Sequence, residues 1–414
     1  MPTTLVPTRL VSPRLVSPVR ENQAQDSLST APYSEKVAAF LQEGHETPFV
    51  VVDLEVVAER YDALHAALPE ADIFYAVKAN PAPEILNTLL ERGSSFDVAS
   101  PGEIDMVLAA GATPDQISYG NTIKKQRDIA GAYRQGVRIF AFDSEAELAK
   151  LVAEAPGSLV FCRILCNGEG ADWPLSRKFG CETEEAERLL LMAADEGFEV
   201  GVSFHVGSQQ RDVHAWDGAL AEISSFARRL LDEGVTLSVV NIGGGFPGTY
   251  LDPMRPVENY AMAIRAALQR HLEPLFGPIG GVTFPRIIAE PGRYMVADAG
   301  VLQTEVVLVS KKHVLDDRRW VYLDVGKFGG LAETMDEAIR YRLRTPHDGQ
   351  MAGNVTIAGP TCDSADVLYE KTDYRLPLAL EAGDLVEVLS TGAYTTTYSA
   401  IGFNGFAPLR SYCV

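Results

Sequence analysis

The 414-residue sequence lacks the features that mark secreted, membrane or nucleic-acid-binding proteins. Its five cysteines form no CxxC pair, and Cys162 and Cys166 stand four apart without a second pair. This pattern does not fit a zinc site, so we expect no metal and reduced thiols in the cytoplasm. No apolar run approaches the length of a membrane span. The 36 basic residues are outnumbered by 56 acidic ones, and the net charge of −20 argues against nucleic acid or an anionic membrane as partner and suits a cationic ligand.

The first 30 residues are rich in proline and contain an imperfect repeat, LVPTR, LVSPR and LVSPVR. This segment is basic and too polar for the core of a signal peptide. We therefore expect residues 1–30 to be a disordered tail. The rest of the chain has an ordinary content of hydrophobic residues and is long enough for two domains.

From about residue 45 to residue 294, short β-like runs, beginning with FVVVDL, alternate with amphipathic helical segments. Stretches such as APEILNTLLERG place apolar residues at the i, i+3, i+4 spacing of a helix packed on one face. Eight strands follow one another between IFYAVKAN and RIIAEPGRY, so we predict an α/β fold with a (β/α)8 TIM-like barrel over residues 31–294. An open doubly wound sheet is the alternative, but no GxGxxG follows the first strand.

After about residue 295 the pattern changes. The segments VLQTEVVLVSKKHVL, RWVYLDV, GNVTIAGPTC and GDLVEVLST alternate or are rich in β-forming residues. Most of them are not separated by helical crossovers, which would be required between parallel strands. We therefore predict a C-terminal, mainly antiparallel β domain over residues 295–414.

Residues capable of chemistry stand where the predicted barrel strands end. Lys78 closes the apolar run IFYAVK, and a buried, unpaired ammonium there would be costly. Because barrel enzymes gather their catalytic groups at the carboxyl ends of the strands, we place Lys78 at the rim and not in the core. The other residues at or near strand ends are Asp97, Asn121, Asp143, Arg163, His205, Gly243, Gly244, Gly245 and Glu290.

A lysine in a poorly solvated pocket has a lowered pKa and can attack an aldehyde, which is how pyridoxal 5′-phosphate is held. This cofactor also needs a phosphate cradle, a partner for its ring nitrogen and packing for its ring. The glycines of NIGGGFPG allow a phosphate to approach the backbone N–H groups, although such a run also forms plain flexible turns. Glu290 is a candidate partner for the ring nitrogen of the cofactor, or it could form an ordinary salt bridge with Arg293. His205 is a candidate for ring packing and Ser208 for the phosphate.

Seven motifs occur in the order in which eukaryotic-type ornithine decarboxylases carry them: YAVKAN, FDVAS, FHVGSQ, NIGGGFPG, AEPGRY, GPTCDSAD and GAYT followed by FNGF. From about residue 45 to residue 408 the chain thus resembles the ornithine/lysine decarboxylase family. These are pyridoxal-phosphate enzymes of fold type III, with the alanine-racemase fold. The resemblance implies that Lys78 forms the Schiff base with the cofactor and that Glu290 binds the ring nitrogen.

The resemblance also implies roles for other residues within these motifs. Asp97 and Arg163 would lie beside the cofactor lysine, Glu103 would lie near the site, and His205 would stack on the ring. The phosphate and the remaining cofactor contacts would come from Ser208, Gly243, Gly244, Gly245, Gly292, Arg293 and Tyr394.

In this family the active site is shared between the subunits of a head-to-tail homodimer. By resemblance, Cys362 of the second subunit would protonate the product-side carbanion, and Asp363 would bind the distal amine of the substrate. Lys178 and Asp366 match a pair that joins the two subunits. The FNGF motif matches a turn that closes the site in this family, and its Phe403 would contact the substrate.

The choice of substrate depends on the distal end of the pocket. Asp363 and Asp336 favour a distal cation, but the aromatic–aspartate pattern of the family becomes Met335-Asp336 here. Ornithine and lysine differ by one methylene, which is worth only about 1–3 kcal/mol in a pocket. The resemblance therefore implies decarboxylation of L-ornithine to putrescine and leaves L-lysine to cadaverine open.

Three other functions are compatible with the same fold. A diaminopimelate decarboxylase substrate carries a distal carboxylate, which the two aspartates would repel. An amino-acid racemase would need a tyrosine base opposite the lysine and has less reason to carry the cysteine motif. A non-catalytic relative that acts as a decoy would have lost catalytic groups, whereas Lys78, Glu290 and Cys362 are all present.

Overall fold

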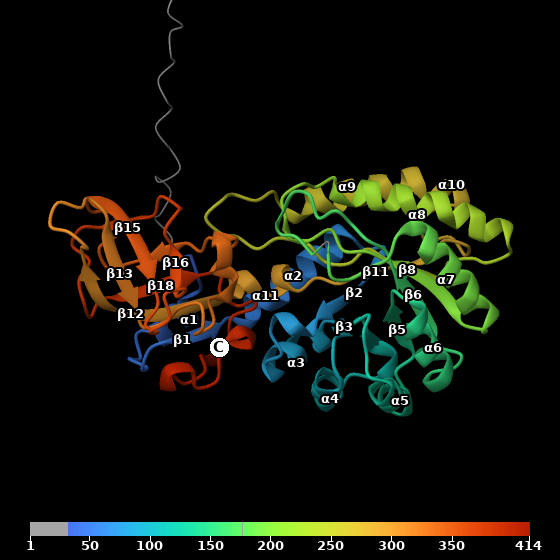
Figure 1. Ribbon diagram of the computed structural model, residues 1–414, viewed down its shortest axis with the longest axis horizontal. Helices are drawn as coiled ribbons and strands as arrows, with labels where there is room; N and C mark the ends of the chain where they lie inside the picture. Colours follow the sequence, from blue (N-terminus) through green and yellow to red (C-terminus); the bar gives the residue numbers. More distant parts are fainter. Residues whose placement is uncertain (1–31, 176) are drawn as a thin grey trace, which may run out of the picture.

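The computed structural model describes residues 32–175 and 177–414. The predicted disordered tail, residues 1–30, lies outside the described residues. Figure 1 shows two lobes side by side, one built around a barrel with helices on its outside and one built from β-strands. Among the described residues, no helix is long and apolar enough to cross a membrane.

The first lobe contains a closed barrel of eight parallel strands, as predicted, and not an open sheet. All eight strands expected between IFYAVKAN and RIIAEPGRY are present and pair in sequence around the barrel. Their bounds are β2 (Ala71–Ala76), β3 (Ser95–Val98), β4 (Ile117–Tyr119), β5 (Ile139–Phe142), β6 (Leu159–Arg163), β8 (Glu199–Ser203), β10 (Val239–Asn241) and β11 (Arg286–Ala289).

Helices on the outside of the barrel begin at recognisable capping residues. In α4 (Pro101–Ala109), the N-cap Ser100 Oγ accepts the N–H of Glu103, and the Glu103 carboxylate accepts the N–H of Ala99, the residue before the cap, at 2.6 Å. These two contacts fix where the helix starts. In α3 a proline stands in the first turn, where no backbone donor is needed. The helices are α2 (Leu54–Ala67), α3 (Pro83–Glu91), α4 (Pro101–Ala109), α5 (Gln126–Arg134), α6 (Glu145–Glu154), α7 (Thr183–Asp195), α8 (Ala215–Asp232), α9 (Val257–His271), α10 (Glu273–Phe276) and α11 (Arg293–Val296).

The second lobe is organised around a nine-stranded sheet that is mixed but mostly antiparallel, as predicted. Among the described strands of this sheet, only the β1–β19 and β13–β15 pairs are parallel. Its strands are β1 (Phe49–Val52), β12 (Gly300–Ser310), β13 (Arg319–Leu323), β14 (Leu343–Arg344), β15 (Ala352–Ala358), β16 (Val367–Tyr369), β17 (Arg375–Pro377), β18 (Leu385–Leu389) and β19 (Arg410–Cys413). The short strands β7 (Ala171–Trp173) and β9 (Ser208–Gln210) pair at the mouth side of the barrel domain.

The strand FVVVDL is placed differently from the sequence-based prediction. We assigned it to the barrel series, but β1 pairs with β12 and β19 of the second lobe. Figure 1 shows β1 and the C-terminus together in that lobe. All four residues of β1 are buried, so its apolar run fits the centre of either sheet, and only the pairing partner decides between them. After β1 the chain enters α2, which packs against the barrel helices.

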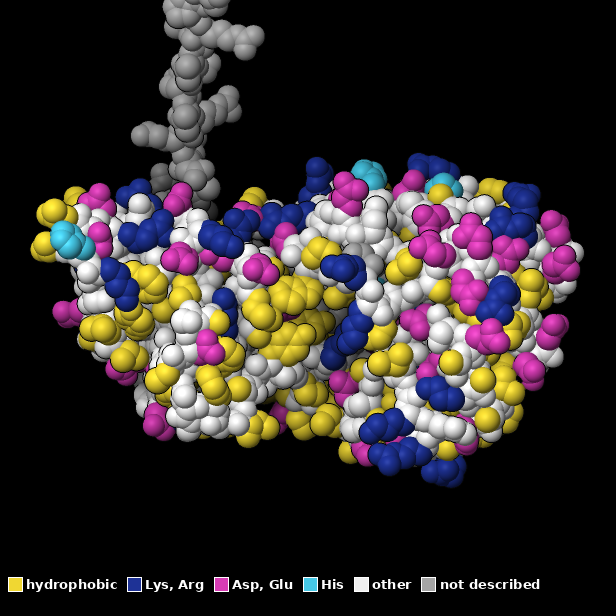
Figure 2. Space-filling model, in the orientation of Figure 1, with side chains coloured by type: hydrophobic (Ala, Val, Ile, Leu, Met, Phe, Trp, Pro, Cys, Tyr) yellow, Lys and Arg dark blue, Asp and Glu magenta, His cyan; other side chains and the backbone are white. Residues whose placement is uncertain are grey.

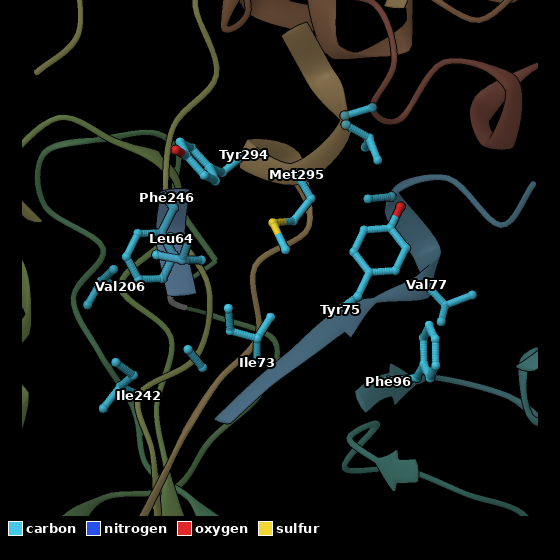
Figure 3. Close-up of a cluster of buried hydrophobic side chains, with 14 of the residues drawn as sticks. Leu64, Ile73, Tyr75, Val77, Phe96, Val206, Ile242, Phe246, Tyr294 and Met295 are labelled. Atoms are coloured by element: carbon cyan, nitrogen blue, oxygen red, sulfur yellow. The ribbon is translucent and has the colours of Figure 1, made fainter. Parts of the chain in front are cut away.

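Burial patterns separate the two lobes. Every residue of β5 is buried, as expected for a parallel strand covered on both faces, whereas buried and partly exposed residues alternate along β13. Figure 3 shows part of the core where the lobes meet: Ile73 and Tyr75 of β2 lie close to Met295 of α11. The Tyr75 hydroxyl donates to the carbonyl of Asn80 at 2.9 Å, and this contact fixes the chain directly after Lys78.

Candidate active site

Lys78 lies in the short helical turn η1 (Val77–Ala79) that follows β2, at the mouth of the barrel. Its side chain is 49% exposed, so it belongs to the rim, as predicted. Lys78 Nζ is 3.2 Å from Oδ2 of Asp97, the penultimate residue of β3, which is almost fully buried. A Cβ atom at Gly120, beyond the end of β4, would overlap Asp97 Oδ1. The glycine therefore provides the space in which this carboxylate lies.

The charge state of Lys78 differs from the sequence-based expectation. Although the side chain opens to the barrel mouth, surrounding protein desolvates the amine and opposes its charge. The negative charges of Asp97 and Glu290, together with the Asp97 hydrogen bond, outweigh this effect and raise the pKa of Lys78 above its usual value. The predicted lowering of this pKa is therefore wrong, because we considered burial and not the two carboxylates that face the amine.

Glu290 follows β11 and points into the same mouth. Burial raises the pKa of Glu290 to about 7, and the nearby charge of Asp97 adds to this effect. Asn241, the last residue of β10, donates its amide N–H to Glu290 Oε1, while its Oδ1 accepts the N–H of Gly243 at 2.9 Å. The sequence analysis did not single out Asn241. It holds the carboxylate and the start of the glycine turn in one fixed arrangement.

The imidazole of His205 is uncharged. Burial lowers its pKa well below the usual value, and the positive charges of Arg163 and Lys78 act in the same direction. His205 Nδ1 accepts the N–H of Gly207 at 3.0 Å, which leaves the proton of the neutral ring on Nε2. A flat, neutral ring at this position is suited to packing on an aromatic cofactor, as the resemblance implies.

The triple glycine forms the turn that the sequence predicted. Gly243 and Gly245 have φ angles of +66° and +105°, which L-residues rarely adopt. A Cβ at Gly244 would lie 2.6 Å from the Glu290 carbonyl oxygen and 3.1 Å from His205 Nε2. The turn thus has no room for side chains, and its backbone lies directly beside both candidate cofactor residues.

Arg293 begins α11 and is buried beside the glycine turn. Its Nε and Nη2 donate to Ser208 Oγ at 3.1 and 3.0 Å, so two residues predicted to bind phosphate are in contact. Its guanidinium lies 4.9 Å from the ring centre of Tyr394. A Cβ at Gly292 would lie 3.0 Å from the Tyr394 hydroxyl. Residues of both lobes therefore meet at this point, including Tyr394, which the second lobe supplies.

Other predicted rim residues stabilise loops. Asn121 Nδ2 donates to the Ala99 carbonyl at 3.3 Å, and Asp143 Oδ2 accepts the N–H of Gly180 at 2.9 Å. The Arg163 guanidinium lies 5.6 Å from the ring centre of Phe179. Arg163 is therefore the member of this group that faces both the loop and the charges of the mouth.

The residues predicted for substrate binding are not part of this cluster within one chain. Cys362 and Asp363 are exposed on a loop after β15. The N–H of Cys362 donates to Asn404 Oδ1 at 2.9 Å, so the cysteine motif and the FNGF turn lie together. Asp336 is exposed in the short helical segment η4 (Ala332–Glu337), and Phe403 packs against Phe328 with ring centres 4.9 Å apart.

Asp366 has a role that the sequence did not suggest. It is 2% exposed, and its carboxylate accepts the N–H groups of Lys327 at 2.8 Å and Thr361 at 3.2 Å and the Thr361 hydroxyl at 2.7 Å. Within one chain, Asp366 thus shapes the loop that carries Cys362, while Lys178 is exposed. The pairing of Asp366 with Lys178 across two subunits stays a prediction.

Comparison with known proteins identifies the family. The model of the pyridoxal binding domain of pyridoxal-dependent decarboxylases matches residues 54–297, more than half of the chain. The chain belongs to this family. A lysine/ornithine decarboxylase of Selenomonas ruminantium is 37% identical over 378 residues, covering 90% of this chain and 91% of that protein. The cofactor of this family is pyridoxal phosphate.

Two further relatives show the range of the family. The structure of a lysine/ornithine decarboxylase from Vibrio vulnificus in complex with putrescine superposes with a TM-score of 0.79 at 30% identity, covering 92% of this chain and 99% of that one. Antizyme inhibitor 2 of Xenopus laevis is 34% identical over 373 residues, covering 86% of this chain and 79% of that protein. The relatives of this chain thus include decarboxylases and also a protein named as an inhibitor.

The mouth of the barrel fits pyridoxal phosphate on the geometry alone. It offers an amine at Lys78, a glycine turn without room for side chains, and a buried arginine beside a serine hydroxyl. A carboxylate, Glu290, and a neutral ring, His205, adjoin that turn. These are the groups that an aldehyde, a phosphate, a pyridine nitrogen and an aromatic face require.

Proposed function

We propose that the protein decarboxylates a basic L-amino acid, L-ornithine to putrescine and also L-lysine to cadaverine, in polyamine biosynthesis in the cytoplasm. The observation that carries this proposal is the cluster of Lys78, Asp97, His205, Glu290 and Arg293 at one barrel mouth in a chain of the pyridoxal-dependent decarboxylase family. The lysine/ornithine decarboxylases of Selenomonas and Vibrio, which are similar over nine-tenths of the chain, support the choice of substrate class.

Pyridoxal phosphate supplies the electron sink for the Cα–carboxylate bond when it is bound. The Glu290 carboxylate, which Asn241 keeps in place, would face the ring nitrogen. Arg293, Ser208 and the glycine turn would hold the phosphate, and His205 would pack on the ring. Lys78 would hold the aldehyde carbon, and Asp97 Oδ2, 3.2 Å from its amine, orients the side chain.

We also propose that a head-to-tail homodimer completes the site. Cys362 and Asp363 are exposed and lie outside the barrel-mouth cluster of their own chain, which agrees with a contribution to a second subunit. The segment that contains Asn404, which accepts the N–H of Cys362, carries exposed hydrophobic side chains at Tyr398, Ile401, Phe403 and Phe406. Figure 2 shows hydrophobic side chains gathered where the two lobes meet on the viewed face, next to a hollow between the lobes. In the dimer, the Cys362 thiol would donate the proton to Cα, and Asp363 would bind the distal ammonium.

The substrate is tested by mass spectrometry of amines after the purified protein and pyridoxal phosphate are incubated with ornithine, lysine, arginine and meso-diaminopimelate together. Putrescine or cadaverine is expected, and their ratio measures the length of the pocket. Lysine formed from diaminopimelate would show that the two aspartates were misinterpreted. No amine product, with cofactor still bound, would contradict the proposed activity and would favour an inhibitor-like role.

The shared site is tested by mixing two inactive variants. Lys78→Ala and Cys362→Ala dimers exchange subunits on mixing, and one of the two sites in each mixed dimer then has both groups intact. Activity should return to at most about a quarter of the wild-type value for random exchange of a two-site dimer. A mixture that stays as inactive as its components, although subunit exchange is demonstrated with tagged chains, would place Cys362 in the site of its own chain.

A further inference from the structure

The guanidinium of Arg293 has no free donor. Its five N–H groups donate to three partners: Nε and Nη2 to Ser208 Oγ, Nη1 to the Tyr250 hydroxyl at 2.9 Å, and Nη1 and Nη2 to the two Glu333 oxygens at 2.7 and 2.6 Å. The side chains of Arg293 and Glu333 are 2% and 4% exposed. Of these hydrogen-bonded partners, only Glu333 carries a charge.

The two edges of the guanidinium therefore have different neighbours. Its side edge, Nε and Nη2, faces Ser208, the other residue assigned to the phosphate. Its end, Nη1 and Nη2, is held by Glu333 in the bidentate geometry that is characteristic of arginine–carboxylate pairs. A phosphate bound beside Ser208 takes the side edge, while Glu333 keeps the end. One buried cation then faces two anionic groups.

We propose that Glu333 is a positioning residue that acts as a stand-in anion for the cofactor phosphate. It holds Arg293 charged and oriented when the phosphate is not bound, and its own charge weakens the hold on the phosphate so that the cofactor can exchange. The proposal rests on the proposed placement of the phosphate at Ser208 and Arg293. It goes beyond that placement because Glu333 touches neither the cofactor nor the substrate.

Electrostatics gives this proposal a definite sign. Burial alone opposes the charge on Arg293, but the negative charge of Glu333 and its hydrogen bonds outweigh that effect and raise the pKa of Arg293 well above the usual value. Removing one partner of a buried ion pair leaves an uncompensated charge, which is strongly destabilising. A phosphate that binds Arg293 relieves this penalty. Loss of the Glu333 charge must therefore destabilise the cofactor-free protein and strengthen phosphate binding.

The test compares pyridoxal 5′-phosphate with pyridoxal, which has the same aldehyde and ring but no phosphate. Dissociation constants are measured by tryptophan fluorescence with cofactor-free wild type and Glu333→Gln. For the variant, the preference for the phosphorylated form should rise by about tenfold, since like charges interact strongly in a poorly solvated site. The affinity for pyridoxal should stay within about twofold, and the cofactor-free variant should unfold at a lower temperature.

Glu337→Gln is the matched control, because Glu337 lies in the same segment but binds the N–H groups of Glu370, Lys371 and Thr372 instead of Arg293. Glu337→Gln should leave the preference for pyridoxal phosphate over pyridoxal unchanged. A general loosening of η4 would instead alter this preference in both Glu333→Gln and Glu337→Gln. If Glu333→Gln does not fold, Glu333→Asp keeps the charge but shortens the side chain, and the preference should then rise by less.

If both Glu333 variants prefer pyridoxal phosphate over pyridoxal no more strongly than wild type does, the inference is overturned. The proposed cofactor site would still stand in that case, provided that the wild-type protein itself binds pyridoxal phosphate more tightly than pyridoxal. A wild type that binds pyridoxal as tightly as pyridoxal phosphate would instead overturn the placement of the phosphate, and the inference with it. The two failures are thus distinguishable in one set of titrations.

Discussion

Replacement of Glu290 by glutamine should remove a specific pH dependence from the stability of the cofactor-free protein. Burial raises the pKa of Glu290 from its usual 4.5 to about 7. Between these two values the folded protein keeps a proton that the unfolded chain has lost. Stability therefore falls as the pH rises through this window and is constant above it. A pKa rise of this size corresponds to about 3 kcal/mol of lost stability at pH 8 relative to pH 4.

The assay is urea unfolding of wild type and Glu290→Gln between pH 4 and pH 8, followed by tryptophan fluorescence. The variant should gain stability relative to wild type by about 3 kcal/mol over this range. Glu199→Gln, at an exposed position at the start of β8, controls for the loss of one carboxylate and should parallel the wild-type curve. A difference between Glu290→Gln and wild type that does not change with pH would refute a raised pKa for Glu290.

The cofactor adds a second arm to the same experiment. A pyridinium nitrogen beside Glu290 favours the ionised carboxylate and lowers its pKa. With pyridoxal phosphate bound, the pH-dependent difference between wild type and Glu290→Gln should shrink or reverse. If the difference persists unchanged in the loaded protein, Glu290 does not contact the ring nitrogen.

Three further predictions concern the site and its surroundings. Gly244→Ala places a Cβ 2.6 Å from the Glu290 carbonyl oxygen, so cofactor affinity measured by fluorescence titration should fall at least about tenfold; unaltered affinity would mean that the turn is not the cradle. Cys362→Ala should bind cofactor like wild type but lose most amine production in the mass-spectrometric assay, and normal production would exclude its thiol as proton donor. Asp366→Asn should lower the unfolding temperature and activity through the Cys362 loop, and unchanged values of both would show that these hydrogen bonds do not shape the loop.

The sequence predicted the barrel well because its periodicity reports local burial. All eight strands were found, since each is a short apolar run followed by a polar rim residue, and β5 is buried along its whole length. The strand β1 was misplaced for the same reason. A fully buried run looks alike in both sheets, and its partners β12 and β19 lie more than 240 residues away in the chain.

The members of the site were predictable where a motif contains them, but their charge states were not. His205, Glu290 and Lys78 come together as expected, yet the raised pKa of Lys78 depends on two carboxylates from separate strands. Asn241 and Glu333 were missed because an asparagine at a strand end and a glutamate in a charged helical stretch carry no signal until their partners are known.

Lys124, beside the barrel, differs from Lys78 in its charge state and in its access to a cofactor. Lys124 is fully buried, donates to the carbonyls of Asn121 and Ala141 and lies 3.1 Å from Glu147. Burial lowers its pKa to about 8. By pKa alone it is the better nucleophile. Its enclosure leaves no space for a ring, whereas Lys78 opens to the barrel mouth beside the glycine turn.

Borohydride reduction of the holoenzyme followed by peptide mass spectrometry tests this central claim most directly. Reduction traps the cofactor on the lysine that holds it, and the mass of the phosphopyridoxyl group marks one peptide. The structure predicts the label on Lys78 and an unmodified Lys124. A label on Lys124, or on any lysine other than Lys78, would contradict the assignment of the barrel mouth as the active site.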